Sequence, residues 1–108
     1  MTLPSVSQKF LAKPVTTVVV AGDSMLPTYA SGDWLVATRV RRIVPGQVVV
    51  IERESRPGIL LIKRVLRAEG QKWWVEGDNT SASDDSRSFG AINESEIIGR
   101  IRFRFRRA

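Results

Sequence analysis

Short runs rich in Val, Ile, Trp and Phe recur along most of the chain, and turn-forming Gly, Pro, Asp and Asn residues separate them. Runs of this length and composition are typical of β-strands. The expected strands are Thr16–Ala21, Trp34–Val40, Gln47–Glu52, Ile59–Leu66, Lys72–Glu76 and Ile97–Phe105. Their even spacing predicts a mostly β, single-domain fold built on a partly closed antiparallel sheet.

The pattern leaves little room for helix. Helical turns are expected only after Ser24 and near Asn93–Glu96. Residues Met1–Pro14 mix Ser, Pro, Lys and Gln without a clear period, which predicts an N-terminal arm over residues 1–14. The folded domain is then expected over residues 15–108.

Composition excludes several kinds of chemistry. The 108 residues include 17 Lys and Arg, 11 Asp and Glu, and neither His nor Cys, so the formal net charge is +6. Without His and Cys there is no Ser-His-Asp triad, thiol nucleophile, disulfide or zinc finger. We expect no metal site and no cofactor, and any hydrolytic chemistry must use Ser, Thr, Lys, Tyr or carboxylates.

No apolar run approaches the roughly 20 residues that a membrane-spanning helix needs. The longest candidate, Val15–Ala21, is interrupted by Thr16 and Thr17. The first residues also lack the charged flank, apolar run and small-residue cleavage site of a secretory signal. The sequence therefore predicts a cytoplasmic protein without a transmembrane anchor.

Ser24 is the first candidate for chemistry, because it follows the end of an apolar strand. A hydroxyl placed there, with the backbone around Gly22, Asp23 and Ser24 free to donate, suits a nucleophile beside an oxyanion hole. The alternative is a plain turn, since Asp and Ser commonly form turns at strand ends.

Lys63 is the second candidate. Strand alternation places Lys63 on one face of Ile59–Leu66 and Arg64 on the other, each among apolar neighbours. A desolvated lysine loses proton affinity and can act as a general base, whereas arginine cannot be deprotonated. The alternative is a lysine that extends its ammonium group to solvent at the sheet margin.

The loop Gly77–Gly90 is dense in Asp, Asn, Ser and Thr. It matches neither an EF-hand nor a phosphate-binding loop. Considered alone, it is a surface loop held by its own hydrogen bonds, in which Asp85 and Arg87 can form an ion pair.

The order and spacing of these motifs resemble the catalytic domain of the signal peptidase I family. The resemblance runs from Gly22 to Arg100. Its motifs are Gly-Asp-Ser-Met-x-Pro-Thr at 22–28, Gly32-Asp33, Pro45–Val50, Ile62–Val65, Gly77-Asp78-Asn79, Ser83–Gly90 and Ile98-Gly99-Arg100. The resemblance implies a fold of the signal peptidase and LexA-like type, with residues 15–108 as the catalytic domain.

Within that family the chain is most similar to the nickel-type superoxide dismutase maturation proteases. Lys63-Arg64-Val65, Trp73-Trp74-Val75 and Gly77-Asp78-Asn79 carry this similarity, and the stretch between Lys63 and Gly77 is too short for an inserted β domain. The implied activity is that of a soluble serine endopeptidase with a Ser-Lys dyad. Its implied substrate is a precursor protein, nickel superoxide dismutase, whose N-terminal extension it removes.

The resemblance also assigns roles to individual residues. Ser24 matches the acylated nucleophile, and Lys63 matches the general base. Gly22 departs from those members that have a hydroxyl residue at this position beside the oxyanion hole. The remaining matches are Ser83, which orients the lysine; Asp78, Asn79, Asp85 and Arg87, which support the site; and Met25 and Pro27, which line the substrate cleft.

Three other functions remain open. The chain could process a different precursor, or it could be a self-cleaving repressor-type domain, although about 20 residues before Ser24 leave no room for a helix-turn-helix. It could also be a binding module, if Arg100–Arg107 points Ile101, Phe103 and Phe105 inward and four arginines outward toward nucleic acid or an acidic partner. Those arginines could equally protect an exposed sheet edge, and we expect no stable nucleic-acid partner.

Overall fold

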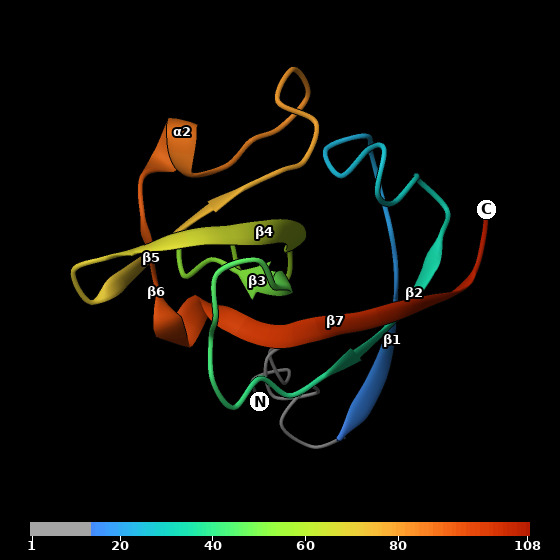
Figure 1. Cartoon of the computed structure of the whole chain (residues 1–108), viewed down its shortest axis with the longest axis horizontal. Helices are drawn as coiled ribbons and strands as arrows, with labels where there is room; N and C mark the ends of the chain where they lie inside the picture. The colour runs from blue at the N-terminus through green and yellow to red at the C-terminus, as the bar shows by residue number, and fades with distance from the viewer. Residues whose placement is uncertain (1–13) are drawn as a thin grey trace.

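A computed structural model describes residues 14–108, so the predicted arm lies outside the described residues except for Pro14. One seven-stranded sheet dominates it, with strand order β1-β2-β7-β3-β4-β5-β6 (Figure 1). Every strand pair is antiparallel. The strands are β1 (Val15–Val19), β2 (Trp34–Thr38), β3 (Val48–Glu52), β4 (Leu60–Glu69), β5 (Lys72–Glu76), β6 (Ile92–Asn93) and β7 (Ile97–Arg106). The predicted mostly β, single-domain fold is confirmed, although β1 and β6 do not pair within residues 14–108 and the sheet stays open.

Helix is limited to two short elements among the described residues, α2 (Ser86–Phe89) and the 3₁₀ turn η1 (Glu94–Glu96). The expected turn of helix near Asn93–Glu96 is therefore present as η1. The turn expected after Ser24 is also present, as one hydrogen bond of helical spacing from the Tyr29 N–H to the Met25 carbonyl at 2.9 Å, but it does not extend into a helix. Residues 24–28 form turns, because Pro27 has no N–H with which to continue helical hydrogen bonding.

Strand β3 lies at the centre of the sheet and is buried on both faces. Val48 and Val50 belong to one apolar cluster, which includes Leu35 and Met25. Val49 and Ile51 belong to a second cluster on the other face. Successive side chains of a strand point to opposite faces, so the uninterrupted run Val48–Ile51 supplies both cores.

The inward orientation expected for the apolar side chains of β7 is wrong in the second half of the strand. Ile101 is buried, but Phe103 and Phe105 are 55% and 48% exposed. The register of β7 against β2 shifts twice, between Val36 and Ala37 and between Trp34 and Leu35. Each bulge adds one residue to β7 and reverses its alternation.

Arg104 instead turns into the protein. Its guanidinium donates to Asp33 Oδ2 at 3.1 Å and to the Thr28 carbonyl at 3.0 Å. The four arginines therefore do not form one outward-facing row.

Two loops that are distant in the sequence meet at one end of the molecule. In Figure 1 the segment that follows β1 and the loop that follows β5 both lie at the top of the view. The second loop contains α2, which is attached to β5 by a 2.9 Å hydrogen bond from the Val75 N–H to Ser86 Oγ. This end of the fold contains most of the residues that the sequence singles out.

Candidate active site

A cleft of about 240 Å³ lies between β1 and the first half of β4. Ser24 and Lys63 both line it, although they belong to separate parts of the chain. Apolar side chains form most of its remaining wall: Val18, Val19, Val20, Met25, Val50, Leu60 and Ile62. The structure thus places the candidate nucleophile and the candidate base in one apolar cleft.

Ser24 is half-buried and follows β1 by a sharp turn. Gly22 has a φ of +82°, a left-handed conformation that glycine adopts without steric cost. The N–H of Gly22 donates to Ser31 Oγ at 3.3 Å. The N–H groups of Asp23 and Ser24 have no acceptor among residues 14–108, so they, and not the N–H of Gly22, are free to bind an oxyanion.

The two residues assigned to the substrate cleft differ in position. Met25 is 1% exposed, packs in the core cluster of Leu35 and Val50, and lines the cleft. Pro27 is exposed and is not part of the cleft wall, because the chain has already turned away from β1. Of these two residues, Met25 alone lines the cleft, and a contact of either with a substrate stays a prediction.

Lys63 is 3% exposed on the buried part of β4. Burial lowers the pKa of its ammonium group, Arg87 lowers it further, and the negative charges of Asp85 and Asp84 oppose the change. The pKa remains below the ordinary value of 10.5. The structure therefore excludes an ammonium group extended to solvent, and it favours the neutral amine that a general base requires.

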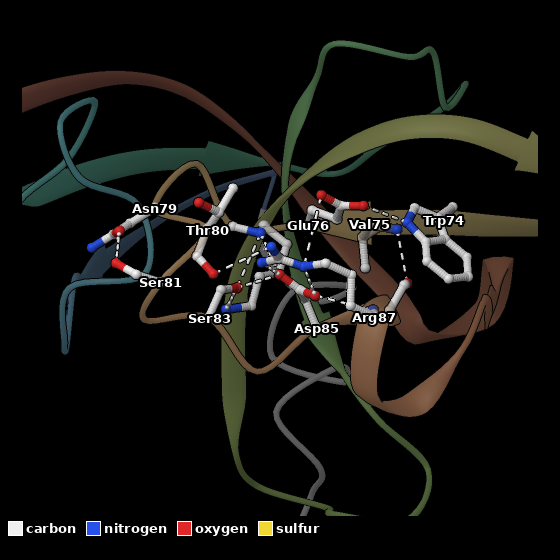
Figure 2. A network of polar contacts seen from close by, with 12 residues as sticks. Trp74, Val75, Glu76, Asn79, Thr80, Ser81, Ser83, Asp85 and Arg87 are labelled. Atoms are coloured by element: carbon white, nitrogen blue, oxygen red, sulfur yellow. Dashed lines mark hydrogen bonds and ion pairs between the residues drawn. The ribbon is translucent and has the colours of Figure 1, made fainter.

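Ser83 belongs to a polar network with Asp85 and Arg87 (Figure 2), and it connects Lys63 to this network. Its Oγ accepts hydrogen bonds from Lys63 Nζ at 3.2 Å and from the Gly77 N–H at 3.1 Å, and it donates to Asp85 Oδ2. These three contacts use the full capacity of a hydroxyl group. The amine of Lys63 is thereby held in one position.

Asp85 is fully buried and joins the ends of the same loop. It accepts from the guanidinium of Arg87 at 2.7 and 3.0 Å, from the Gly77 N–H at 2.9 Å and from the Arg87 N–H at 3.1 Å. Burial alone would raise the pKa of Asp85, but the hydrogen bonds from Arg87, Ser83 and the backbone hold it far below its usual range. Asp85 is therefore a charged anchor of the loop, and the predicted ion pair with Arg87 is present.

Asp78 and Asn79 fasten this loop to the segment that contains Ser24. Asp78 accepts two hydrogen bonds from the guanidinium of Arg64, each at 2.8 Å, and it also accepts from the Thr28 hydroxyl at 2.5 Å. The contact with Arg64 lowers the pKa of Asp78. Asn79 donates its N–H to the Ser24 carbonyl at 2.8 Å and its Nδ2 to the Asp23 carbonyl at 3.0 Å.

Three residues that build this arrangement have no role predicted from the sequence. Thr28 and Arg64 are partners of Asp78, and no local pattern indicates either contact. Gly77 lies against the site so closely that an added Cβ would be 2.6 Å from the Ser24 carbonyl oxygen and 2.3 Å from Ser83 Oγ. Its place in the Gly-Asp-Asn motif is the one signal that could have pointed to it.

Within residues 14–108 no group of three or more His, Cys, Asp or Glu side chains is arranged to hold a metal ion. In the same part of the chain, no helix has the length and apolar character to cross a membrane. The site described above consists of a serine, a lysine and their hydrogen-bonding partners.

The open antiparallel sheet and the cleft that contains Ser24 and Lys63 define a domain of the signal-peptidase-like class. Over residues 3–102 the sequence matches the Peptidase S24-like family, and the chain belongs to this family.

The curated relatives include mitochondrial inner membrane protease subunit 1 of Xenopus tropicalis, 32% identical over 78% of this chain and 65% of the relative. The human protein of the same name is 32% identical over 81% of this chain and 67% of its own length. Signal peptidase IB of Staphylococcus aureus is 53% identical over a shorter stretch, 32% of this chain and 18% of the relative. The chain thus spans about two thirds of the length of the mitochondrial relatives.

These similarities agree with the expected signal-peptidase-like family. They do not identify nickel superoxide dismutase as a substrate. The cytoplasmic location and the boundary at residue 14 also stay predictions.

Proposed function

We propose that this protein is a serine endopeptidase that uses Ser24 as nucleophile and Lys63 as general base to cleave a precursor protein. The main support is that Ser24 and a buried Lys63 of lowered pKa line the same cleft. The family membership and the similarity to signal peptidase IB support the same class of reaction.

The proposed reaction has two stages. Neutral Lys63 Nζ accepts the Ser24 hydroxyl proton while Oγ attacks the peptide carbonyl carbon; Lys63 then passes this proton to the leaving amine as the peptide bond breaks. An acyl-enzyme ester remains on Ser24. Lys63 next accepts one proton from water as the water oxygen attacks the ester carbonyl, and it returns that proton to Ser24 Oγ as the C–O ester bond breaks. The product leaves as a carboxylic acid, which loses its remaining proton to solvent.

The positions of the supporting groups fit this reaction. The free N–H groups of Asp23 and Ser24 are available to stabilise the negative oxygen of each tetrahedral intermediate. Because Lys63 donates one N–H to Ser83, the nitrogen lone pair of the neutral amine remains available to Ser24.

The cleft also offers main-chain groups to an extended substrate. Strand β1 pairs only with β2 in the described chain, and β5 pairs with β4 only from Arg64 onward. Thr17–Ala21 and Leu60–Lys63 line the cleft from opposite sides. We propose that the substrate segment enters as an added strand between these two free edges.

The proposed substrate is the precursor of nickel superoxide dismutase, on the basis of the motif similarity around Lys63, Trp73-Trp74 and Gly77. Another secreted or imported precursor is the second candidate, because the curated relatives carry the names of signal peptidase and mitochondrial inner membrane protease. The nickel ion would be bound by the substrate after processing.

The test is incubation of the purified protein with the nickel superoxide dismutase precursor, with the precursor mass followed over time. We expect loss of the N-terminal extension with the wild-type protein and with Ser55→Ala, an exposed serine in the turn after β3. Ser24→Ala should give no cleavage while its circular dichroism stays unchanged.

The outcomes separate the chemistry from the substrate. Cleavage that persists in Ser24→Ala would reject the proposed nucleophile. If the folded wild-type protein leaves this precursor intact but cleaves a signal-peptide-bearing precursor, the dyad is retained and the nickel superoxide dismutase assignment is rejected.

A further inference from the structure

A second, larger cavity contains a concentration of positive charge. This groove, of about 1120 Å³, is lined by residues of the β2–β3 connection and of β7. Its five arginines are Arg39, Arg41, Arg42, Arg100 and Arg102, and none of the lining residues within 14–108 is acidic. We call it the arginine groove.

The arginines of this groove lack acidic partners. No ion pair among the described residues includes any of them, whereas Arg64 and Arg104, outside the groove, pair with Asp78 and Asp33. Arg39, Arg41 and Arg42 are exposed, and their side chains make no hydrogen bond within residues 14–108. Five uncompensated charges in one concave surface attract a complementary anionic chain.

The concave shape and the side chains of the groove favour an acidic polypeptide over other anionic partners. A lipid surface is flat and would meet the rim of a groove more readily than its floor. Single-stranded nucleic acid is held largely by stacking of successive bases on aromatic rings. Phe103 is the one aromatic residue that lines the arginine groove in the described chain.

The arginine groove lies close to the cleft along the same strand. Pro14 lines the groove and Thr17 lines the cleft, three positions further along. Three residues of an extended strand span about 10 Å. A single polypeptide can therefore occupy both sites.

We propose that the arginine groove binds a Glu- and Asp-rich segment of the polypeptide substrate and so acts as a docking site separate from the cleft. The link to the substrate depends on the proposed peptidase function. The binding itself is independent of it, because the groove contains neither Ser24 nor Lys63.

The test measures binding to the Ser24→Ala protein by fluorescence anisotropy, so that no cleavage interferes. The probe is a short dye-labelled peptide in which Glu alternates with Gly, compared with the same peptide in which Gln replaces Glu. We expect binding of the Glu peptide that weakens steeply between about 50 and 300 mM salt, because screening shortens the range of exposed charges.

A matched pair of variants locates the binding. Arg41→Gln with Arg42→Gln should weaken binding about tenfold, since two exposed ion pairs with the peptide are lost. Arg67→Gln with Lys72→Gln removes the same charge from exposed positions outside the groove and should change binding less than twofold.

Equal weakening by both pairs, or no binding of the Glu peptide, would overturn the proposal. Tighter binding of an oligothymidylate or of phosphatidylserine vesicles than of the Glu peptide would overturn it in favour of nucleic acid or membrane. Peptide binding without any protease activity would retain the docking site and reject the peptidase function.

Discussion

The main-chain N–H of Asn79 donates a 2.8 Å hydrogen bond to the carbonyl oxygen of Ser24. A second bond, from Asn79 Nδ2 to the Asp23 carbonyl, fixes the preceding residue. The loop after β5 therefore holds the nucleophile segment, and the same loop holds Lys63 through Ser83. The relative position of the two proposed catalytic groups depends on this one loop.

Gly77→Ala should disturb both contacts at once. The added Cβ would be 2.6 Å from the Ser24 carbonyl oxygen and 2.8 Å from Ser83 Cβ, closer than nonbonded atoms approach. We expect the loop to move and precursor cleavage to fall at least about 100-fold, since small displacements of reacting groups are costly. The double variant Gly77→Ala with Ser83→Ala should not regain cleavage, because the added Cβ still lies against the Ser24 carbonyl oxygen. Wild-type activity in Gly77→Ala would contradict the close packing of Gly77 against these residues.

The rate of cleavage should rise with pH as Lys63 loses its proton. The pKa of Lys63 in the folded protein lies below 10.5, so its neutral amine forms at a lower pH than that of an ordinary lysine. The plateau of kcat/KM is therefore also reached at a lower pH. Lys63→Arg should reduce kcat/KM by about 100-fold or more, because arginine stays protonated. Lys72→Arg, at an exposed lysine, is the control and should leave the profile unchanged.

Ser83→Ala should act through Lys63. Loss of the 3.2 Å contact leaves Lys63 Nζ without this acceptor, so we expect kcat to fall about tenfold with little change in KM. The contact is stronger with the ammonium form than with the amine, so its loss should also shift the acid limb of the pH profile to lower pH. The control is Ser88→Ala, at an exposed serine of α2, which should change neither kcat nor the pH profile. If the acid limb of the pH profile does not shift in Ser83→Ala, Ser83 has only a structural role.

Asp85→Asn should destabilise the folded protein in a pH-dependent way. Because the folded pKa of Asp85 lies well below the unfolded value of about 3.9, its charge contributes fully above that value. That contribution is lost as the pH falls through the folded pKa. Urea unfolding should give a free energy of unfolding lower by about 2 to 4 kcal/mol at neutral pH, with the difference shrinking below about pH 4.

The control for Asp85 is its neighbour Asp84, whose exposed carboxylate makes one long ion pair of 3.7 Å with Arg56. Asp84→Asn should change the free energy of unfolding by less than about 0.5 kcal/mol. A difference between wild type and Asp85→Asn that stays constant down to pH 3 would show that the carboxylate charge is not responsible.

The strands were predictable because their information is local. Short runs rich in Val and Ile and bounded by Gly and Pro favour a strand. In β3 the run Val48–Ile51 is apolar without interruption because the strand is covered on both faces. The absence of His and Cys and the spacing of the motifs around Ser24 and Lys63 were equally readable. The missing residue types limit hydrolytic chemistry to Ser, Thr, Lys, Tyr or carboxylates, and the motif spacing predicts Ser24 and Lys63 among these.

The bulges in β7 were not predictable from its alternating Arg and Phe residues, because register depends on the partner strand. The pairing of Arg64 and Thr28 with Asp78 likewise depends on two loops that meet only in the folded chain. The same holds for the burial of Lys63, since a strand position becomes desolvated only when other segments cover it. The order of residues along the chain specifies the strands and the available side chains. Which side chains meet, and which lose contact with water, follows from the folded arrangement, because hydrogen bonds and desolvation depend on distance in space.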